Sequence, residues 1–182
     1  MALLFVLVGS HGFMHIVQNN RELWADSLFQ IWTRFGEGWP VPIAILTLWK
    51  VNTDHGERMQ SLRAFALALI LTLVVSQGLK LVFSESPRPW SVHPAVPDFP
   101  ALVKRYYKSF PSGHTSFAVA IAATWSTVAP KKYRFPIGMF LLALGVAFSR
   151  IYLHMHWLHD VLAGGLLGLG CSYIALRWVG YR

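Results

Sequence analysis

The chain has 182 residues, of which 54% are hydrophobic and 13% are charged, and its mean hydropathy is +0.44. A soluble domain of this length cannot bury so much apolar surface, so the composition excludes an ordinary soluble domain and indicates a bilayer as the solvent. The net charge of +8 does not indicate a nucleic-acid partner, because the Lys and Arg residues lie between apolar runs and form no contiguous stripe. Phosphate and anionic lipid are better partners for that charge.

The apolar runs predict an all-α fold, a polytopic membrane helix bundle with about six transmembrane helices. A helix needs about 20 apolar residues to cross a bilayer. Runs at 64–83, 112–128, 136–153 and 158–179 come close to that length, and shorter runs at 2–17 and 39–51 complete the count. Residues 22–34 mix aromatic and aliphatic side chains with charges, which predicts an amphipathic helix at the membrane interface.

The basic residues predict the orientation of the bundle, because Lys and Arg in short loops gather on the cytoplasmic side. They occur in three regions: Lys50, Arg58 and Arg63; Lys131, Lys132 and Arg134; Arg177 and Arg182. With an even number of crossings, both termini are then cytoplasmic. The connection at 82–110 and the turn at 154–157 lie on the opposite face. Trp157 and Trp178 flank the last run, which predicts an aromatic belt at the two interfaces.

The first polar cluster on that opposite face joins Lys80 to Arg88 and Pro89. Lys80 follows an apolar run, and an unpaired charge at a membrane boundary is costly. A lysine that reaches the headgroups from a helix end is an equally good interpretation of Lys80 alone. Arg88 lies between two prolines, so a stiff backbone would hold a guanidinium that can bind phosphate through two donors.

The second cluster, residues 111–114, directly precedes an apolar run and reads Pro-Ser-Gly-His. Proline, a small hydroxyl residue and glycine at a helix start leave backbone N–H groups available to an anion. For Ser112 and Gly113 alone, an ordinary helix N-cap is the better interpretation. His114 adds a group that donates or accepts a proton at the same place.

The third cluster contains Ser149, Arg150, His154, His156, His159 and Asp160. Residues four apart share a helix face, so Asp160 can accept a hydrogen bond from one nitrogen of His156 and leave the other for nucleophilic attack. His156, His159 and Asp160 are equally suitable as three ligands of a zinc ion. The other clusters favour phosphate chemistry, because a metal site gives no role to the distant cations. Three cationic donors and a helix start match the charge of a pentacoordinate phosphoryl transition state.

These three motifs, in this order, resemble those of the type 2 phosphatidic acid phosphatase superfamily, which also includes the vanadium haloperoxidases. The first motif departs from the family pattern, because one additional residue separates Lys80 from Arg88. The resemblance covers roughly residues 64–179. It implies a single membrane-embedded lipid phosphatase domain, residues 1–182, with its motif-bearing core at 64–179.

The resemblance also implies a metal-independent reaction without a cofactor. His156 would attack phosphorus to form a phosphohistidine, Asp160 would fix the tautomer of His156, and His114 would protonate the leaving oxygen. The residues that would bind the phosphate oxygens are Lys80, Arg88, Ser112, Gly113 and Arg150. The expected location is a cytoplasmic (inner) membrane, with the active site on its periplasmic or extracellular face. The expected partners are the bilayer and the lipid phosphate, with no nucleic acid and no obligate protein partner.

The motifs do not choose among several substrates: undecaprenyl pyrophosphate, phosphatidylglycerophosphate, a lipid A phosphate and phosphatidic acid. The alternatives are transfer of the phosphoryl group to another lipid, a metal-dependent membrane protein that uses the third cluster, and a non-catalytic protein of lipid binding or transport. Arg105, Tyr106, Tyr107 and Lys108 are candidate headgroup contacts, and an interfacial anchor is an equal alternative for them.

Overall fold

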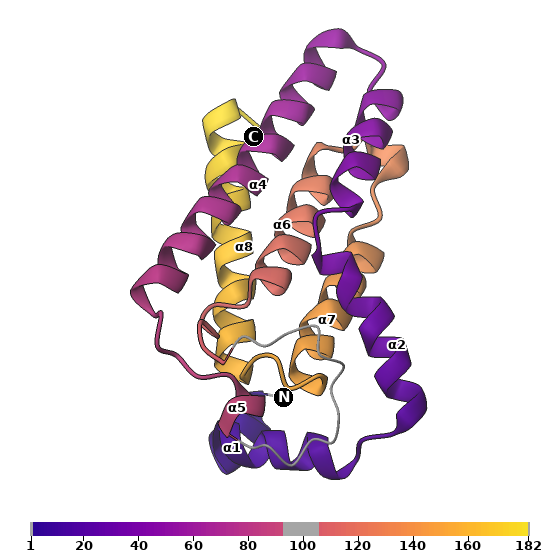
Figure 1. Cartoon of the computed structure of the whole chain (residues 1–182). Helices are drawn as coiled ribbons and strands as arrows, with labels where there is room; N and C mark the ends of the chain where they lie inside the picture. The colour runs from indigo at the N-terminus through magenta and orange to yellow at the C-terminus, as the bar shows by residue number, and fades with distance from the viewer. Residues whose placement is uncertain (1, 93–105, 182) are drawn as a thin grey trace.

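A computed structural model describes residues 2–92 and 106–181, in which long helices run side by side as a bundle (Figure 1). In chain order, the elements are α1 (Ala2–Asn19), α2 (Leu23–Thr33), η1 (Arg34–Gly36), α3 (Pro40–Val51), α4 (His55–Val82), α5 (Pro89–Val92), α6 (Gly113–Val128), η2 (Lys131–Tyr133), α7 (Pro136–Tyr152) and α8 (Leu158–Val179). The described residues contain no strand, so the predicted all-α class is confirmed.

Local sequence signals set several helix ends. The side chain of Asp54 accepts a hydrogen bond of 2.8 Å from the backbone N–H of Glu57 and so caps the start of α4. Pro40 and Pro136 open α3 and α7, where their missing N–H groups cost no helical hydrogen bond. Gly180 ends α8 with a φ of 84°, a left-handed conformation that glycine adopts without penalty.

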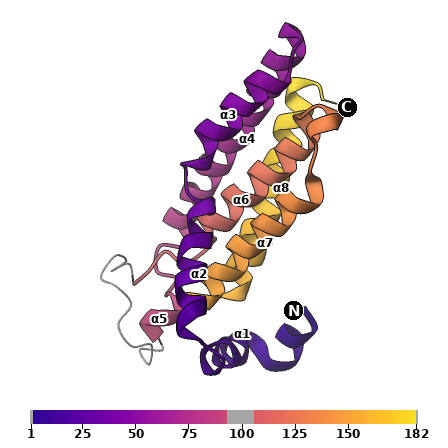
Figure 2. The same ribbon diagram turned by 90° about the vertical axis from the view of Figure 1, so that its right-hand side faces the viewer.

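The segment at 22–34 runs along the bundle, so its predicted place at the membrane interface is wrong. The Phe29 ring lies 5.3 Å from the ring of Phe148, and Trp32 donates a hydrogen bond of 3.2 Å to the carbonyl of Leu142. These contacts place α2 antiparallel to the second half of α7, and α3 continues along the bundle beyond η1 (Figure 2). An apolar helix face packs on a neighbouring helix as readily as on a bilayer surface, and the sequence pattern is the same in both cases.

Helix α1 lies across the end of the bundle near α5 and does not run along it (Figure 2). Gly9, with φ 70° and ψ 172°, interrupts the helix and divides the apolar run into pieces too short to cross a bilayer. Phe13 and Met14 pack on Trp157 and Leu158. The described passes along the bundle are therefore α2 with α3, then α4, α6, α7 and α8. The two ends of the chain lie at opposite ends of the bundle, contrary to the predicted topology with six crossings and both termini on one face (Figure 1).

The outer surface of the bundle is apolar. Helices α4 and α8 are long and apolar enough to cross a membrane, and α3 and α7 are shorter apolar helices. Exposed side chains on α4 and α8 include Val74 (62% exposed) and Leu166 (72%). The described residues of the predicted basic regions lie together at the end of the bundle opposite α5, where α3 meets α4, where η2 joins α6 to α7, and where α8 ends (Figure 1). Arg182 lies outside the described residues.

Small residues bring α8 close to α6, the helix that packs against α4, α7 and α8. A methyl group on Gly164 would lie only 2.6 Å from the carbonyl oxygen of Ser112, a separation that real contacts do not show. The adjacent Gly165 has no atom within 4 Å of the corresponding position. The packing of α8 on the start of α6 therefore requires glycine at residue 164 and not at residue 165.

We expect Gly164→Ala to lower the melting temperature in detergent, because the added methyl group forces α8 away from the loop that carries Ser112. Gly165→Ala is the matched control, since alanine there meets open space and favours the helix by up to about 1 kcal/mol. Thermal unfolding of the two purified variants and the wild type measures the difference. Equal melting temperatures for the two variants would contradict the tight contact at Gly164.

Candidate active site

The three polar clusters of the sequence meet at the end of the bundle where α4 and α7 end and α6 and α8 begin (Figure 1). The backbone N–H of Ser112 donates a hydrogen bond of 3.0 Å to the carbonyl of Asp160. One guanidinium nitrogen of Arg88, Nη1, donates a hydrogen bond of 2.9 Å to the carbonyl of Met155. Residues that are far apart in the sequence are thus joined directly, and the clusters form one site.

His156 and Asp160 face one another at the start of α8. His156 Nδ1 lies 3.4 Å from Asp160 Oδ2, and both side chains are buried. This separation exceeds that of an ordinary hydrogen bond, so the contact is chiefly electrostatic. His156 precedes the first residue of α8, Leu158, so the predicted pairing does not come from a shared helix face. It arises because a turn precedes the helix and Asp160 lies in its first turn.

The Asp160 carboxylate has further donors that fix its position. Oδ2 accepts hydrogen bonds from the hydroxyl of Ser109 and, at 2.9 Å, from the backbone N–H of Trp157. His159 Nε2 lies 3.3 Å from Oδ1. The bond from Trp157 caps the start of α8, where a negative charge is also favoured by the helix dipole. The carboxylate therefore orders the helix and faces His156 at the same time.

Arg150 shapes the turn that carries His156. It is 7% exposed and donates a hydrogen bond of 2.8 Å from Nη1 to the hydroxyl of Thr33. Its carbonyl accepts hydrogen bonds from the backbone N–H groups of Met155 (3.0 Å) and His156 (3.2 Å). His154 has a φ of 54°, and this left-handed backbone conformation lets the chain reverse between α7 and α8.

Arg88 is 4% exposed and is held by backbone carbonyls. Besides Met155, its guanidinium donates to the carbonyl of Tyr107 at 3.3 Å. The loop around Arg88 also pairs with the second half of the long connection, since Ser109 N–H donates to the carbonyl of Ser86 at 3.1 Å. These hydrogen bonds fix the position of the Arg88 side chain. The two neighbouring prolines stiffen only the backbone.

Lys80 reaches the site despite the additional residue in the first motif. A methyl group on Gly113 would come 3.5 Å from Lys80 Nζ, so the ammonium group lies beside the start of α6. Helix α4 continues to Val82 and ends at Phe83. The additional residue therefore falls in the turn after the helix, where it does not change the direction of Lys80.

His114 lies in the first turn of α6, opposite a segment that connects α2 to α3. Its Nε2 is 3.9 Å from Oε1 of Glu37. A methyl group on Gly36 would lie 2.8 Å from the Cβ of His114, so only glycine allows this approach. Ser112 caps α6 without a side-chain bond to the backbone, because its hydroxyl pairs with that of Thr115 at 2.9 Å.

Several residues of this site were missed by the sequence analysis: Thr33, Gly36, Glu37, Ser109 and Trp157. Trp157 is 5% exposed and donates a hydrogen bond of 2.8 Å to the carbonyl of Pro87, so its predicted place in an aromatic belt is wrong. In the sequence, its position next to His156 was the feature that could have indicated a role in the site. The residues of 33–37 follow no recognisable motif, and their role depends on how α2 packs.

The residues suggested for zinc are not arranged as a ligand set. His159 is exposed, and the ring of His154 lies 3.4 Å from the amide nitrogen of Gln18. Within residues 2–92 and 106–181, no group of three or more His, Cys, Asp or Glu side chains is placed to hold a metal ion. Of the candidate headgroup contacts, Tyr106, Tyr107 and Lys108 are exposed, and Arg105 lies outside the described residues.

Two histidines and three cations at one end of a helical bundle supply the proton-transfer groups and the positive charge that phosphoryl transfer requires. The model of the PAP2 superfamily matches residues 61–182, and the chain belongs to this superfamily. The predicted family is confirmed.

Similar proteins come from all three domains of life. The chain is 29% identical to an undecaprenyl-diphosphatase of Sulfolobus acidocaldarius over 89% of this chain and 74% of that protein. It is 31% identical to a probable lipid phosphate phosphatase beta of Arabidopsis thaliana, over 63% of this chain and 64% of that protein. The structure of Aquifex aeolicus LpxE superposes with a TM-score of 0.73 at 27% identity, over 91% of this chain and 93% of that one. A Bacillus subtilis phosphatidylglycerolphosphate phosphatase shares the fold, with a TM-score of 0.67 at 23% identity over 95% of this chain and 85% of that one.

Burial lowers the pKa of His156 from 6.5 to about 3, because the protonated ring would lose its hydration. Its side chain lies in the turn between α7 and α8. The imidazole is therefore neutral at physiological pH and keeps a nitrogen lone pair that can act as a nucleophile.

The same lowered pKa predicts a pH-dependent stability. As the pH falls below about 6.5, the unfolded chain binds a proton at His156 while the folded protein does not, so folding is weakened. At pH 5, roughly 1.5 pH units lower, the loss amounts to about 2 kcal/mol. We expect His156→Gln to lose less stability than the wild type between pH 7 and pH 5 in thermal unfolding. Parallel losses in both proteins would show that His156 does not titrate in this way.

Proposed function

We propose that this protein is an integral membrane hydrolase that removes phosphate from a lipid through a phosphohistidine at His156. The observation that carries the proposal is a buried, neutral His156 whose Nδ1 faces the Asp160 carboxylate. This contact keeps the proton on Nδ1 and leaves Nε2 as the nucleophile.

The reaction has two balanced steps. Nε2 of His156 forms a bond to phosphorus while the bond from phosphorus to the leaving oxygen breaks, and His114 supplies the proton that this oxygen takes. Water then attacks phosphorus while the bond from phosphorus to Nε2 breaks, His114 takes a proton from this water, and inorganic phosphate leaves. Asp160 stabilises the positive charge that His156 carries in both transition states.

Cationic groups surround the place where the phosphoryl oxygens would lie. Lys80 Nζ lies beside Gly113, and Arg88 and Arg150 are buried near His156. The free N–H groups at the start of α6, with Ser112 and Gly113, add donors that favour an anion. Buried donors held before the substrate arrives stabilise transition-state charge without reorganisation. This supports the proposed phosphate-binding roles of Lys80, Arg88, Ser112, Gly113 and Arg150.

Glu37 lies beside the proposed acid His114. Its Oε1 is 3.9 Å from Nε2, close enough for the carboxylate to orient the ring. Glu37 is half exposed, so its charge lies at the mouth of the site and not within the ring of cations.

The substrate class is a lipid phosphate or diphosphate. The names of the similar proteins support this class, since they act on undecaprenyl diphosphate and on lipid phosphates. We further propose that residues 1–182 form one domain in a cytoplasmic membrane, with the basic end of the bundle in the cytoplasm and the site on the other face. The grouping of the basic regions away from the site supports this orientation.

Replacing the nucleophile should abolish turnover. We expect His156→Ala to lower kcat for a lipid phosphate on the order of 10³-fold or more, because no covalent intermediate forms. His159→Ala is the matched control, since His159 is exposed and lies beside Oδ1 of Asp160, not beside the Oδ2 that faces His156; it should retain activity within a few-fold. Release of inorganic phosphate by purified protein in detergent measures both. Near-normal turnover by His156→Ala would place the nucleophile elsewhere.

The proposed chemistry needs no metal. We expect phosphate release to persist in EDTA and to be inhibited by vanadate, which adopts the five-coordinate geometry of the transition state and binds more tightly than substrate. The assay compares untreated, EDTA-treated and vanadate-treated enzyme. Loss of activity in EDTA with recovery on adding zinc would contradict the proposed mechanism and favour the metal alternative.

A further inference from the structure

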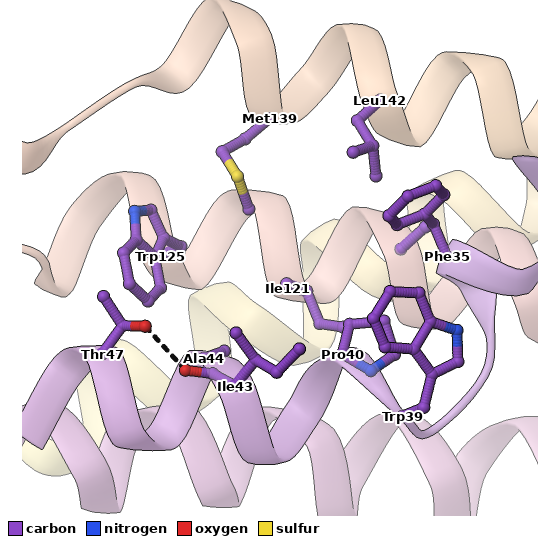
Figure 3. A pocket seen from close by; sticks show the side chains of 11 residues that line it. Phe35, Trp39, Pro40, Ile43, Ala44, Thr47, Ile121, Trp125, Met139 and Leu142 are labelled. Atoms are coloured by element: carbon purple, nitrogen blue, oxygen red, sulfur yellow. Dashed lines mark hydrogen bonds between the residues drawn. The ribbon is translucent and has the colours of Figure 1, made fainter.

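A pocket of about 310 Å³ lies between α3, α6 and α7 (Figure 3). Its walls include Trp39 and Ile43 from the α3 side, Ile121 and Trp125 from α6, and Met139 from α7. Besides the indole nitrogens of Trp39 and Trp125, Figure 3 shows the hydroxyl of Thr47, which already donates a hydrogen bond of 2.7 Å to the carbonyl of Ile43. The described lining therefore offers apolar contact and binds a hydrocarbon better than a polar ligand.

The pocket begins beside the catalytic site. Phe35 lines it and directly precedes Gly36, which packs against His114. Ala118 also lines it and lies one helical turn after His114 on α6. From Ala118 to Trp125 the pocket follows α6 for about 10 Å away from the site, toward the basic end of the bundle. A phosphate among the cations would thus have an apolar space directly behind its leaving group.

The pocket also borders the apolar outer surface. Ile43 on α3 is 55% exposed, and Leu141 on α7, next to the pocket residue Leu142, is 59% exposed. Such side chains face hydrocarbon in a bilayer. A lipid tail can therefore reach the pocket from the membrane without crossing water.

We propose that this pocket holds one hydrocarbon chain of the substrate, the part adjacent to the phosphate, and so selects substrates by the shape of that chain. The inference rests on the proposed phosphatase function and deepens it. The phosphate lies at the end of the bundle and the chain extends from Phe35 toward Trp125. A single pocket of this volume, bounded by three helices, takes one chain and leaves any second chain in the bilayer.

The test introduces a large side chain at the edge of the pocket. Thr47→Trp places an indole in the pocket at a partly buried position, and Leu46→Trp adds the same group to the adjacent, lipid-facing residue as a control. Each protein is assayed on a long-chain polyprenyl phosphate and on the phosphate ester of a small water-soluble alcohol, which does not reach the pocket. One methylene group in an apolar pocket changes discrimination by about tenfold or more.

We expect Thr47→Trp to lower kcat/KM for the long-chain substrate by about tenfold or more, while the soluble ester changes less than about twofold. Leu46→Trp should leave both values near those of the wild type. Equal losses on the two substrates, or no loss on either, would overturn the pocket as a chain site while leaving phosphatase function intact. A wild-type protein that hydrolyses neither substrate would instead refute the proposed function itself.

A second measurement does not depend on folding of the variants. A polyprenyl phosphate with a photoreactive group on its chain should cross-link the wild type within α3 or α6, at residues that line the pocket. Addition of unlabelled long-chain phosphate should suppress this product, and the soluble ester should not. Cross-links that map to the outer faces of α4 or α8 would contradict the proposal.

Discussion

The carboxylate of Asp160 is fully buried, and an ionised group in that position is stable only when donors surround it. Ser109 and Trp157 donate hydrogen bonds to it from the long connection and from the start of α8, and His156 faces it from the preceding turn. Satisfying one buried charge therefore fixes three separate stretches of chain. The histidine is oriented as a consequence of the same arrangement that lets α8 begin.

The remaining site geometry follows from the order of the helices. Because α4, α6, α7 and α8 alternate in direction, the connection after α4 and the turn after α7 must lie at the same end of the bundle (Figure 1). That end contains the first turns of α6 and α8, whose free N–H groups favour an anion. The cations therefore gather where two helix starts favour an anion. At the other end, where α4 and α7 begin, the side chain of Asp54 caps α4.

This explains how much of the site could be predicted from sequence. The three motifs occur at helix ends, where proline, glycine and capping residues are visible in the chain, and the alternation of passes brings them together. Lys80 was uncertain by sequence alone, because spacing does not show where α4 ends. The length of α4 explains the position of Lys80. The helix continues past Lys80 to Val82, so the additional residue lies in the following turn and the ammonium group still lies beside Gly113.

The first fifty residues could not be predicted as well, because their pattern fits two environments. The apolar stripe of α2 suits a membrane surface or a neighbouring helix, and only the ring of Phe148 and the carbonyl of Leu142 decide between these. The run at 2–17 has the composition of a span, but Gly9 breaks it. Both errors concern competition between helix and lipid for the same apolar face, which single-chain periodicity does not resolve.

The break between α2 and α3 has a physical reason that links the polar site to the apolar pocket. A side chain at residue 36 would collide with the Cβ of His114 and with Val146, so the chain must approach α6 through glycine. The turn of η1 at this point carries Glu37 toward His114 and Phe35 into the wall of the pocket. A straight helix through residues 23–51 would place neither Glu37 nor Phe35 at these positions. The two neighbours of Gly36 thus have different surroundings, since Glu37 faces the polar site and Phe35 lines the apolar pocket.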